Sequence, residues 1–122
     1  MIIGKKCNIG EFCHITAANK IVIGDGVLIG RWCTISDNSH GVTDNIKELQ
    51  TPPQLRMVKS KGQVHIGDNV WLGDKVTVLA GVSIGEGSII GANSVVVKDV
   101  PPYSVAVGNP TRIIKTLKYE TI

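Results

Sequence analysis

One histidine lies at the point where the apolar pattern of the sequence ends. His40 follows the polar run Ser36–Ser39, and the apolar pattern of the preceding residues is then absent from Gly41 to Gly62. A neutral imidazole at an exposed position can take the proton of a hydroxyl group, so His40 is a candidate general base. Asp37 could orient the imidazole or contact a substrate. Asp37 and Asn38 could equally serve only to form a turn.

The other histidines and the cysteines do not form a metal-binding pattern. His14 and His65 each precede an apolar repeat position, so alternation along a strand directs them outward. The three histidines lack the close pairing that a zinc site needs. Cys7, Cys13 and Cys33 show no Cys-x-x-Cys spacing and occupy small-residue positions. We therefore predict no bound metal, and buried reduced thiols rather than a disulfide or a covalent nucleophile.

Length and charge narrow the function classes. The chain has 122 residues, which suits one domain over 1–122. A net charge of +3 is too small to indicate nucleic-acid binding, although a few basic side chains could hold an anionic cofactor. The sequence contains no apolar run of about 18 residues and no signal-peptide layout. It predicts a cytoplasmic protein without a membrane span.

The candidate histidines and cysteines lie in or beside a six-residue repeat, so the structure of the repeat must position them. A period of six is neither helical nor simple strand alternation, and it is typical of short strands separated by tight turns. Each unit is too short to bury its own apolar side chain, so successive coils must stack. The pattern predicts an all-β parallel β-helix. All twelve repeat positions are Ile, Leu or Val: Ile3, Ile9, Ile15, Ile23, Ile29, Ile35, Ile66, Leu72, Val78, Ile84, Ile90 and Val96.

Two interruptions and a tail complete the predicted organisation. Two extra residues near Asn19 and Lys20 predict a bulged corner, and the coils cover 1–40 and 63–108. The loop 41–62 is long enough that it should be functional or disordered, and we interpret it as an arm that leaves the prism and returns. The tail 109–122 is predicted as a short helix or a segment that packs back on one face.

Three stretches of the chain resemble one enzyme family. They are Ile-Gly-Asp-Asn-Val-Trp-Leu-Gly at 66–73, Ile-Gly-Ala-Asn-Ser-Val-Val-Val-Lys-Asp-Val-Pro at 90–101, and Ala-Val-Gly-Asn-Pro-Thr-Arg at 106–112. Together they are similar to the hexapeptide-repeat acyltransferases, in the branch of galactoside, maltose and polysaccharide O-acetyltransferases. The resemblance implies a single-stranded left-handed parallel β-helix, with one loop excursion and a short tail. It also implies a homotrimer with an acetyl-CoA cleft between neighbouring subunits.

The same resemblance implies an activity and a set of site residues. The activity is acetyl-CoA-dependent O-acetylation of a sugar or surface-polysaccharide precursor, by direct transfer with His40 as the general base. Asp37 and Asn38 are candidates for substrate binding, and no metal takes part. The implied cofactor-binding residues are Trp71, Asp74, Ala92, Val97, Lys98, Arg112 and Lys115.

The sequence departs from the family pattern at several positions. Gly41 stands where the family often has proline, and Val97 replaces a threonine. Ala18 occupies the place of an acidic residue that galactoside enzymes use for the sugar. The amino-terminal helical segment of those enzymes is missing, and the loop is longer. Two alternatives stay open: N-acetylation of an amino sugar, and a non-catalytic trimeric β-helix assembly module.

Overall fold

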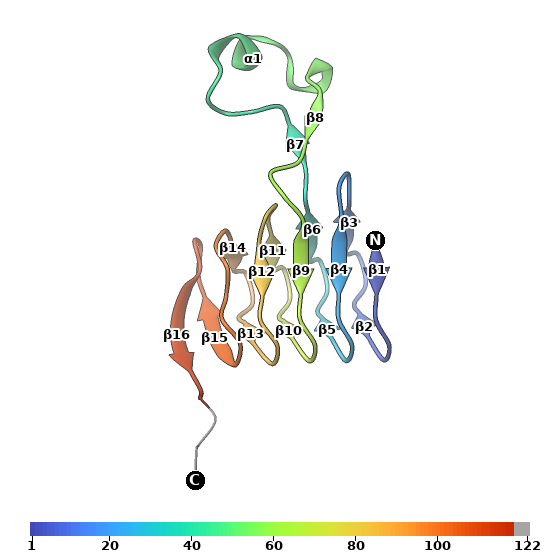
Figure 1. Cartoon of the computed structure of the whole chain (residues 1–122), viewed down its shortest axis with the longest axis vertical. Coiled ribbons are helices and arrows are strands. Elements are labelled where there is room, and N and C mark those ends of the chain that lie inside the picture. Colours follow the sequence, from blue (N-terminus) through green and yellow to red (C-terminus); the bar gives the residue numbers. More distant parts are fainter. Residues whose placement is uncertain (119–122) are drawn as a thin grey trace.

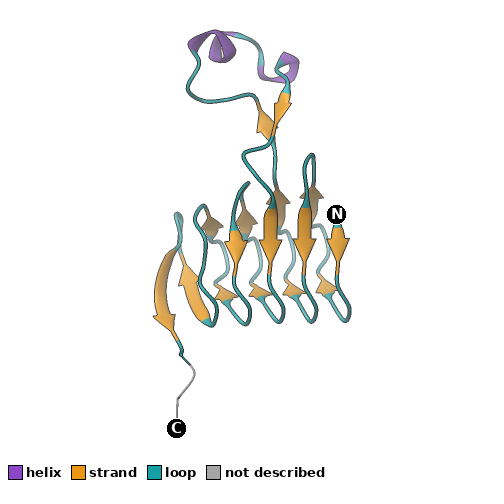
Figure 2. Cartoon of the chain, viewed as in Figure 1, coloured by secondary structure: helices purple, strands orange, loops and turns teal. Residues whose placement is uncertain are grey.

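Three parallel sheets enclose one apolar core in the computed structural model, which describes residues 1–118 (Figures 1 and 2). Four successive coils each give one strand to each sheet, and we name the sheets A, B and C in chain order. Sheet A contains β1 (Ile2–Ile3), β4 (Ile21–Ile23), β9 (Val64–Ile66) and β12 (Ser83–Ile84). Sheet B contains β2 (Asn8–Ile9), β5 (Leu28–Ile29), β10 (Trp71–Leu72), β13 (Ile89–Ile90), β15 (Ser104–Val107) and β16 (Arg112–Thr116). Sheet C contains β3 (His14–Thr16), β6 (Thr34–Ser36), β11 (Thr77–Val78) and β14 (Val95–Val96).

The register places equivalent repeat positions above one another. In sheet B, Trp71 lies beside Leu28 of one neighbouring coil and Ile89 of the other. Backbone hydrogen bonds join the coils, as from Gly30 N to Leu72 O at 2.9 Å. The outward side chains form ladders on each sheet, and the turns form three corners that run the length of the prism. The predicted parallel stacking of coils is therefore present.

The inward ladder forms the core where coils stack on both sides. Ile3 and Ile9 are still 46% and 38% exposed, because they lie in the first coil and no coil covers their outer side. The exposed His14 and His65 point outward, as predicted. Nine of the twelve repeat side chains are buried: Ile23, Ile29, Ile35, Ile66, Leu72, Val78, Ile84, Ile90 and Val96.

The three cysteines are free thiols at two corners of the prism. Cys7 lies between β1 and β2, whereas Cys13 and Cys33 lie in adjacent coils at the corner between sheets B and C. Cys33 is buried, whereas Cys7 and Cys13 are half-buried because they lie in the first coil. The Cys13 thiol donates to Gly30 O at 3.0 Å, and the Cys33 thiol donates to Gly73 O at 3.2 Å. Burial is the main cause that raises the pKa of the Cys33 thiol. The predicted burial is therefore met by Cys33 alone, and the reduced state stays a prediction.

The predicted loop 41–62 is an ordered arm. It leaves sheet C after β6 and returns to β9, and it rises beyond the prism (Figure 1). Asn45 caps α1 by accepting from Glu48 N at 3.3 Å, and Arg56 donates to the carbonyl oxygens of Thr51 and Leu49 at 2.8 and 3.1 Å. These local bonds hold the arm in shape without a core of its own. Its elements are β7 (Ser39–His40), α1 (Ile46–Gln50), the 3-10 turn η1 (Pro53–Leu55) and β8 (Val58–Lys59).

The tail forms a strand where a short helix or a packed segment was expected. β16 turns back and pairs antiparallel with β15, with Val107 opposite Arg112. Ser104 and Thr116 also share a hydrogen bond between their hydroxyl groups at 2.9 Å. The β-branched run at 113–114 suits a strand, and the last parallel strand of sheet B offers a free edge to pair with. Residues 119–122 of the predicted tail lie outside the described residues.

Candidate active site

His40 lies at the base of the arm, outside the coils in which the sequence placed it. It belongs to β7, and the pairing of β7 with β8 puts His40 opposite Val58 and Ser39 opposite Lys59. The last residue of the coil is Ser36 at the end of β6. His40 is exposed to solvent, while two backbone segments hold its position. An exposed imidazole on a fixed backbone is suited to accept a proton from a substrate.

The residue after His40 explains one departure from the family pattern. Gly41 has a φ of +84°, in the left-handed region that glycine enters without a steric cost. Proline is restricted to a φ near −65° and cannot adopt this conformation. A hydrogen bond from Ser39 Oγ to Gly41 O at 3.0 Å supports the same turn. The arm therefore leaves the coil by a route that requires Gly41.

The sequence left several roles open for Asp37, and its surroundings in the structure favour a structural one. Its side chain is fully buried, and its carboxylate accepts from the backbone amides of Ala18 and Asn19 at 2.7 and 2.8 Å. Burial alone would raise its pKa, but backbone hydrogen bonds and the side-chain amide of Asn38 together hold the pKa of Asp37 below its ordinary value. The carboxylate has no exposed surface for a substrate, and it bonds to Ala18, Asn19 and Asn38. Instead it holds the bulged corner in place.

We expect Asp37→Ala to destabilise the fold by about 1.5–3 kcal/mol at pH 7, because the backbone amides of Ala18 and Asn19 lose their charged acceptor. Since folding lowers the pKa of Asp37, its contribution is present above the ordinary aspartate pKa of about 3.9 and is lost as the pH falls through the folded-state value. Urea unfolding at pH 7 and pH 3, at one protein concentration, measures both effects. Asp44→Ala removes an exposed carboxylate and is the matched control. Equal stability of Asp37→Ala and Asp44→Ala would contradict this role.

The foot of the arm borders a hollow of about 310 Å³. Asn38 and Val97 line it, together with Lys61 from the returning chain and Leu79. Asn38 is half-buried and donates to Thr16 O at 3.2 Å, so its amide is held in place at the hollow's edge. The hollow lies at the C–A corner, where each chain segment passes from sheet C to sheet A. It therefore brings one substrate candidate and one cofactor candidate close to the arm that carries His40.

A second hollow of about 390 Å³ lies on sheet B and its corner with sheet C. Trp71, Asp74 and Ala92 line it, and Trp71 is 49% exposed. Ile89 lines this hollow and also a neighbouring one of about 210 Å³ that includes Lys115. These shared walls make a track along sheet B. The track unites four of the seven predicted cofactor residues.

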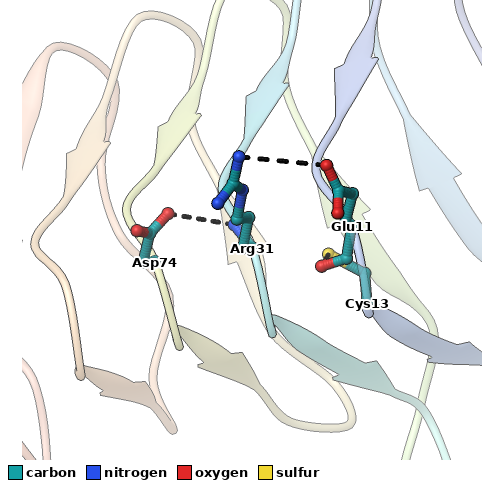
Figure 3. A network of polar contacts seen from close by, with 4 residues as sticks. All are labelled: Glu11, Cys13, Arg31 and Asp74. Carbon is teal, nitrogen blue, oxygen red and sulfur yellow. Dashed lines mark hydrogen bonds and ion pairs between the residues drawn. The ribbon is translucent and has the colours of Figure 1, made fainter.

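Asp74 also has a structural bond at this corner. Its carboxylate accepts from Arg31 N at 2.9 Å, and Arg31 forms an ion pair with Glu11 at 3.8 Å (Figure 3). Asp68 makes the same kind of bond to Asp25 N at another corner. Asp74 thus joins two coils and lines the track at the same time.

The predicted site residues form two groups at opposite edges of sheet C. One group lies at the C–A corner, with Val97 in the hollow, Lys98 exposed beside it and His40 on the arm. The other lies along sheet B and the B–C corner. Arg112 is exposed on β16 and lines neither hollow. The strands of sheet C separate the two groups, so one chain does not gather them around a single ligand.

Sequence reasoning missed some lining residues of both hollows. Ile89 precedes a repeat position, so strand alternation would have directed it outward to the surface of sheet B. Lys61 belongs to the basic loop, but the loop sequence carried no signal that its end returns to Asn38. Both hollows are smaller than one of about 650 Å³ on sheet A, which contains no predicted site residue. Asp68, Glu86 and Asp99 line that larger hollow, so it is unsuited to an anionic cofactor.

Within residues 1–118, no three ligating side chains lie close enough to hold a metal ion. In the same part of the chain, no helix has the length and apolar character needed to cross a membrane.

Comparison with known proteins identifies a family model and a relative that match the sequence of this chain. The family model "Bacterial transferase hexapeptide (six repeats)" matches residues 63–98. The "Putative lipopolysaccharide biosynthesis O-acetyl transferase WbbJ" of Escherichia coli strain K12 is 39% identical over 116 residues, which are 93% of this chain and 59% of that protein. The chain thus spans less than two thirds of that relative.

Two solved structures share the architecture. A hexapeptide-repeat acetyltransferase of Vibrio cholerae, in complex with acetyl coenzyme A, has a TM-score of 0.82 and 34% identity, over 96% of this chain and 60% of that chain. A maltose O-acetyltransferase of Clostridium difficile 630 has a TM-score of 0.69 and 32% identity, over 97% of this chain and 70% of that chain. Both likenesses extend over nearly all of the coils and the arm.

Proposed function

We propose that this chain, which belongs to the hexapeptide-repeat acyltransferase family, transfers an acetyl group from acetyl-CoA to a hydroxyl group of a sugar or surface-polysaccharide precursor. The observation that carries the proposal is the exposed His40 on the fixed base of the arm, beside the hollow lined by Asn38 and Val97. Three free thiols fit a reducing compartment, which supports a cytoplasmic location. We further propose that the coils wind left-handed, as in the family that the sequence resembles.

The chemistry needs a base and a stabilised oxyanion. The acceptor hydroxyl oxygen attacks the thioester carbonyl carbon while the His40 imidazole takes the hydroxyl proton. The tetrahedral oxyanion then collapses, the carbon–sulfur bond breaks, and the departing thiolate receives the proton from the imidazolium. A fixed N–H donor must face the oxyanion to lower this barrier. No covalent enzyme intermediate is required, and the stacked cysteines are unsuited to form one.

The proposed cofactor path follows the track on sheet B. Trp71, Asp74 and Ala92 would line the pantetheine arm. The cationic side chains of Arg112 and Lys115 would neutralise the nucleotide phosphates, and Lys98 at the C–A corner would reach the same cofactor from a neighbouring subunit. From β5 to β16 this path crosses four strand spacings, roughly 19 Å at about 4.8 Å each. The thioester end would then lie at the level of the second coil, from which the arm begins.

A homotrimer would complete this site. Three copies packed side by side with parallel long axes would bring the C–A corner of one subunit against sheet B of the next, so His40 would face its neighbour's track. Exposed apolar side chains favour such packing, because Leu28 and Trp71 form a ladder on sheet B while Ile46 and Leu55 on the arm are 74% and 72% exposed. Symmetric assembly is the common solution for such a repeated surface.

Acetyl-CoA turnover with a panel of sugars tests the function. We expect release of the CoA thiol with at least one hydroxylated sugar, and a rise in melting temperature when acetyl-CoA is added. Arg112→Ala should weaken acetyl-CoA binding while leaving the melting temperature without ligand unchanged, because the side chain is exposed. Acetylation of amino sugars alone would favour the N-acetyl alternative. Absence of both acetyl-CoA binding and turnover would leave the assembly-module alternative.

A further inference from the structure

Two aromatic side chains are stacked on the surface near the amino-terminal end of the prism. The rings of Phe12 and Trp32 have centroids 4.5 Å apart and planes 20° apart. Phe12 is 65% exposed and Trp32 is 57% exposed. The chain has only five Phe, Trp and Tyr residues, and two of the five lie in this one exposed stack. Neither ring contributes to the apolar core.

The backbone holds both rings in an unusual conformation. Phe12 and Trp32 have φ values of 61° and 60°, in the left-handed region that bulky residues seldom adopt. Lys75 and Asn93 occupy the same turn in the next two coils, and Asn is a residue that tolerates this conformation well. An aromatic ring at such a turn carries a conformational cost that burial does not offset here. Other coils meet the same backbone requirement with Lys or Asn, so the exposed rings are the feature particular to these two turns.

The stack lies at the thioester end of the proposed cofactor path. Lys75 N bonds to Arg31 O at 2.8 Å, and Trp32 N bonds to Glu11 O at 3.0 Å, so these turns follow one another along the B–C corner. Trp32 is therefore one coil beyond Asp74, at a spacing of about 4.8 Å. Arg31 and Glu11 precede the two aromatic residues and project their charges from the same corner (Figure 3). Their side chains are 65% and 68% exposed.

The stack is also at the level of the candidate base. Trp32 belongs to the coil formed by β4, β5 and β6, and the arm with His40 leaves from the end of β6. Rotation about an axis parallel to the prism keeps every residue at its level. In the proposed trimer, the Trp32 of one subunit would thus face the level of His40 in the next. The acceptor must reach this level to meet both the base and the thioester.

We propose that Phe12 and Trp32 form a platform on which a sugar ring of the acceptor stacks, with Arg31 and Glu11 binding its hydroxyl groups. This inference rests on the proposed acetyltransferase function. A pyranose ring presents a face of C–H groups that matches an aromatic surface, and a rim of hydroxyl groups that needs polar partners. The platform supplies both kinds of surface at one corner. It sets acceptor specificity and leaves acetyl-CoA binding to the residues farther along the track.

The test uses asparagine variants, because Asn69 and Asn93 adopt the same backbone conformation with φ values of 58° and 63°. Trp32→Asn and Phe12→Asn therefore remove the rings and keep the turns. We expect the KM for the acetylated sugar to rise about tenfold or more, with the Kd of acetyl-CoA and the molecular mass of the assembly unchanged. Trp32→Tyr, which restores an aromatic face, should recover most of the acceptor affinity.

The matched control is Lys6→Asn, at an exposed left-handed turn of the same first coil as Phe12 but at a different corner. It should leave the acceptor KM unchanged. An unchanged KM in Trp32→Asn would overturn the platform. An equal effect of Lys6→Asn would overturn it too, as would a fall in molecular mass, which would place the ring in a subunit contact.

A binding measurement separates this inference from the proposed function. The chain has two tryptophans, so the indole N–H signal of Trp32 in a ¹⁵N spectrum is identified by its loss in Trp32→Asn. Addition of the sugar panel should shift this signal, and acetyl-CoA alone should not. A wild-type protein that acetylates no sugar refutes the proposed function. A Trp32 signal that no sugar moves refutes the platform, whatever the turnover.

Discussion

We expect that replacing His40 with alanine lowers turnover by about 10²–10⁴-fold, the usual contribution of a general base. The loss appears in kcat, because proton abstraction assists only the transition state. The Kd of acetyl-CoA and the melting temperature stay close to those of the wild-type protein, since His40 is exposed and fills no core position. Steady-state kinetics with the identified acceptor, together with a direct binding measurement for acetyl-CoA, check these values.

A second histidine makes this test specific. His14→Ala is the control, because His14 is also exposed and lies on β3 opposite Thr34, within the coils rather than on the arm. Full turnover by His40→Ala would show that the base lies elsewhere. Asp44 on the arm or a residue of a neighbouring subunit would then be the next candidate, because Asp37 is fully buried.

Mixing two inactive variants restores activity if the site lies between subunits. His40→Ala removes the base at the arm, and Ala92→Trp blocks the hollow on sheet B, where Ala92 is exposed. Each variant alone has turnover reduced by at least about 10²-fold. In a mixed trimer, which holds two copies of one variant and one of the other, one of the three interfaces carries both intact halves. Turnover then rises at least tenfold over either variant.

The comparison depends on mixed assemblies, so the two variants are produced together in one cell with different affinity tags and purified through both. A double variant with both changes, produced together with His40→Ala, leaves no interface with both halves intact and stays inactive. Recovery in that control would indicate contamination or another base. No recovery in the mixed variants, with the assembly intact by light scattering, would place both halves of the site within one chain.

The repeat carried most of the information about the coils. Each repeat position and the small residue four positions later specify a turn of the prism, because a side chain of the wrong size cannot enter the narrow core. This logic failed only in the first coil, where Ile3 and Ile9 stay partly exposed. The sequence pattern is the same there, but burial needs a further layer of chain that stacks on the outer side.

The arm and the tail were harder to predict because their shape depends on partners distant in the sequence. The loop contains no repeat, yet the caps and hydrogen bonds of Asn45 and Arg56 order it. Ile113 and Ile114 suit a strand, but only the free edge of β15 selects that outcome for the tail. A local sequence pattern does not report which edge remains unpaired.

The sequence by itself determined the stacked coils, the loop that interrupts them and the family resemblance that named the site residues. Those features are local, because the period of six and the short motifs act through neighbouring residues. Only the tertiary structure decided that Asp37 is buried beneath the bulged corner, that Phe12 stacks on Trp32, and that the predicted site residues divide between two edges of sheet C. Each of these depends on residues a full coil or more apart, and their distance is set by how the coils wind and stack.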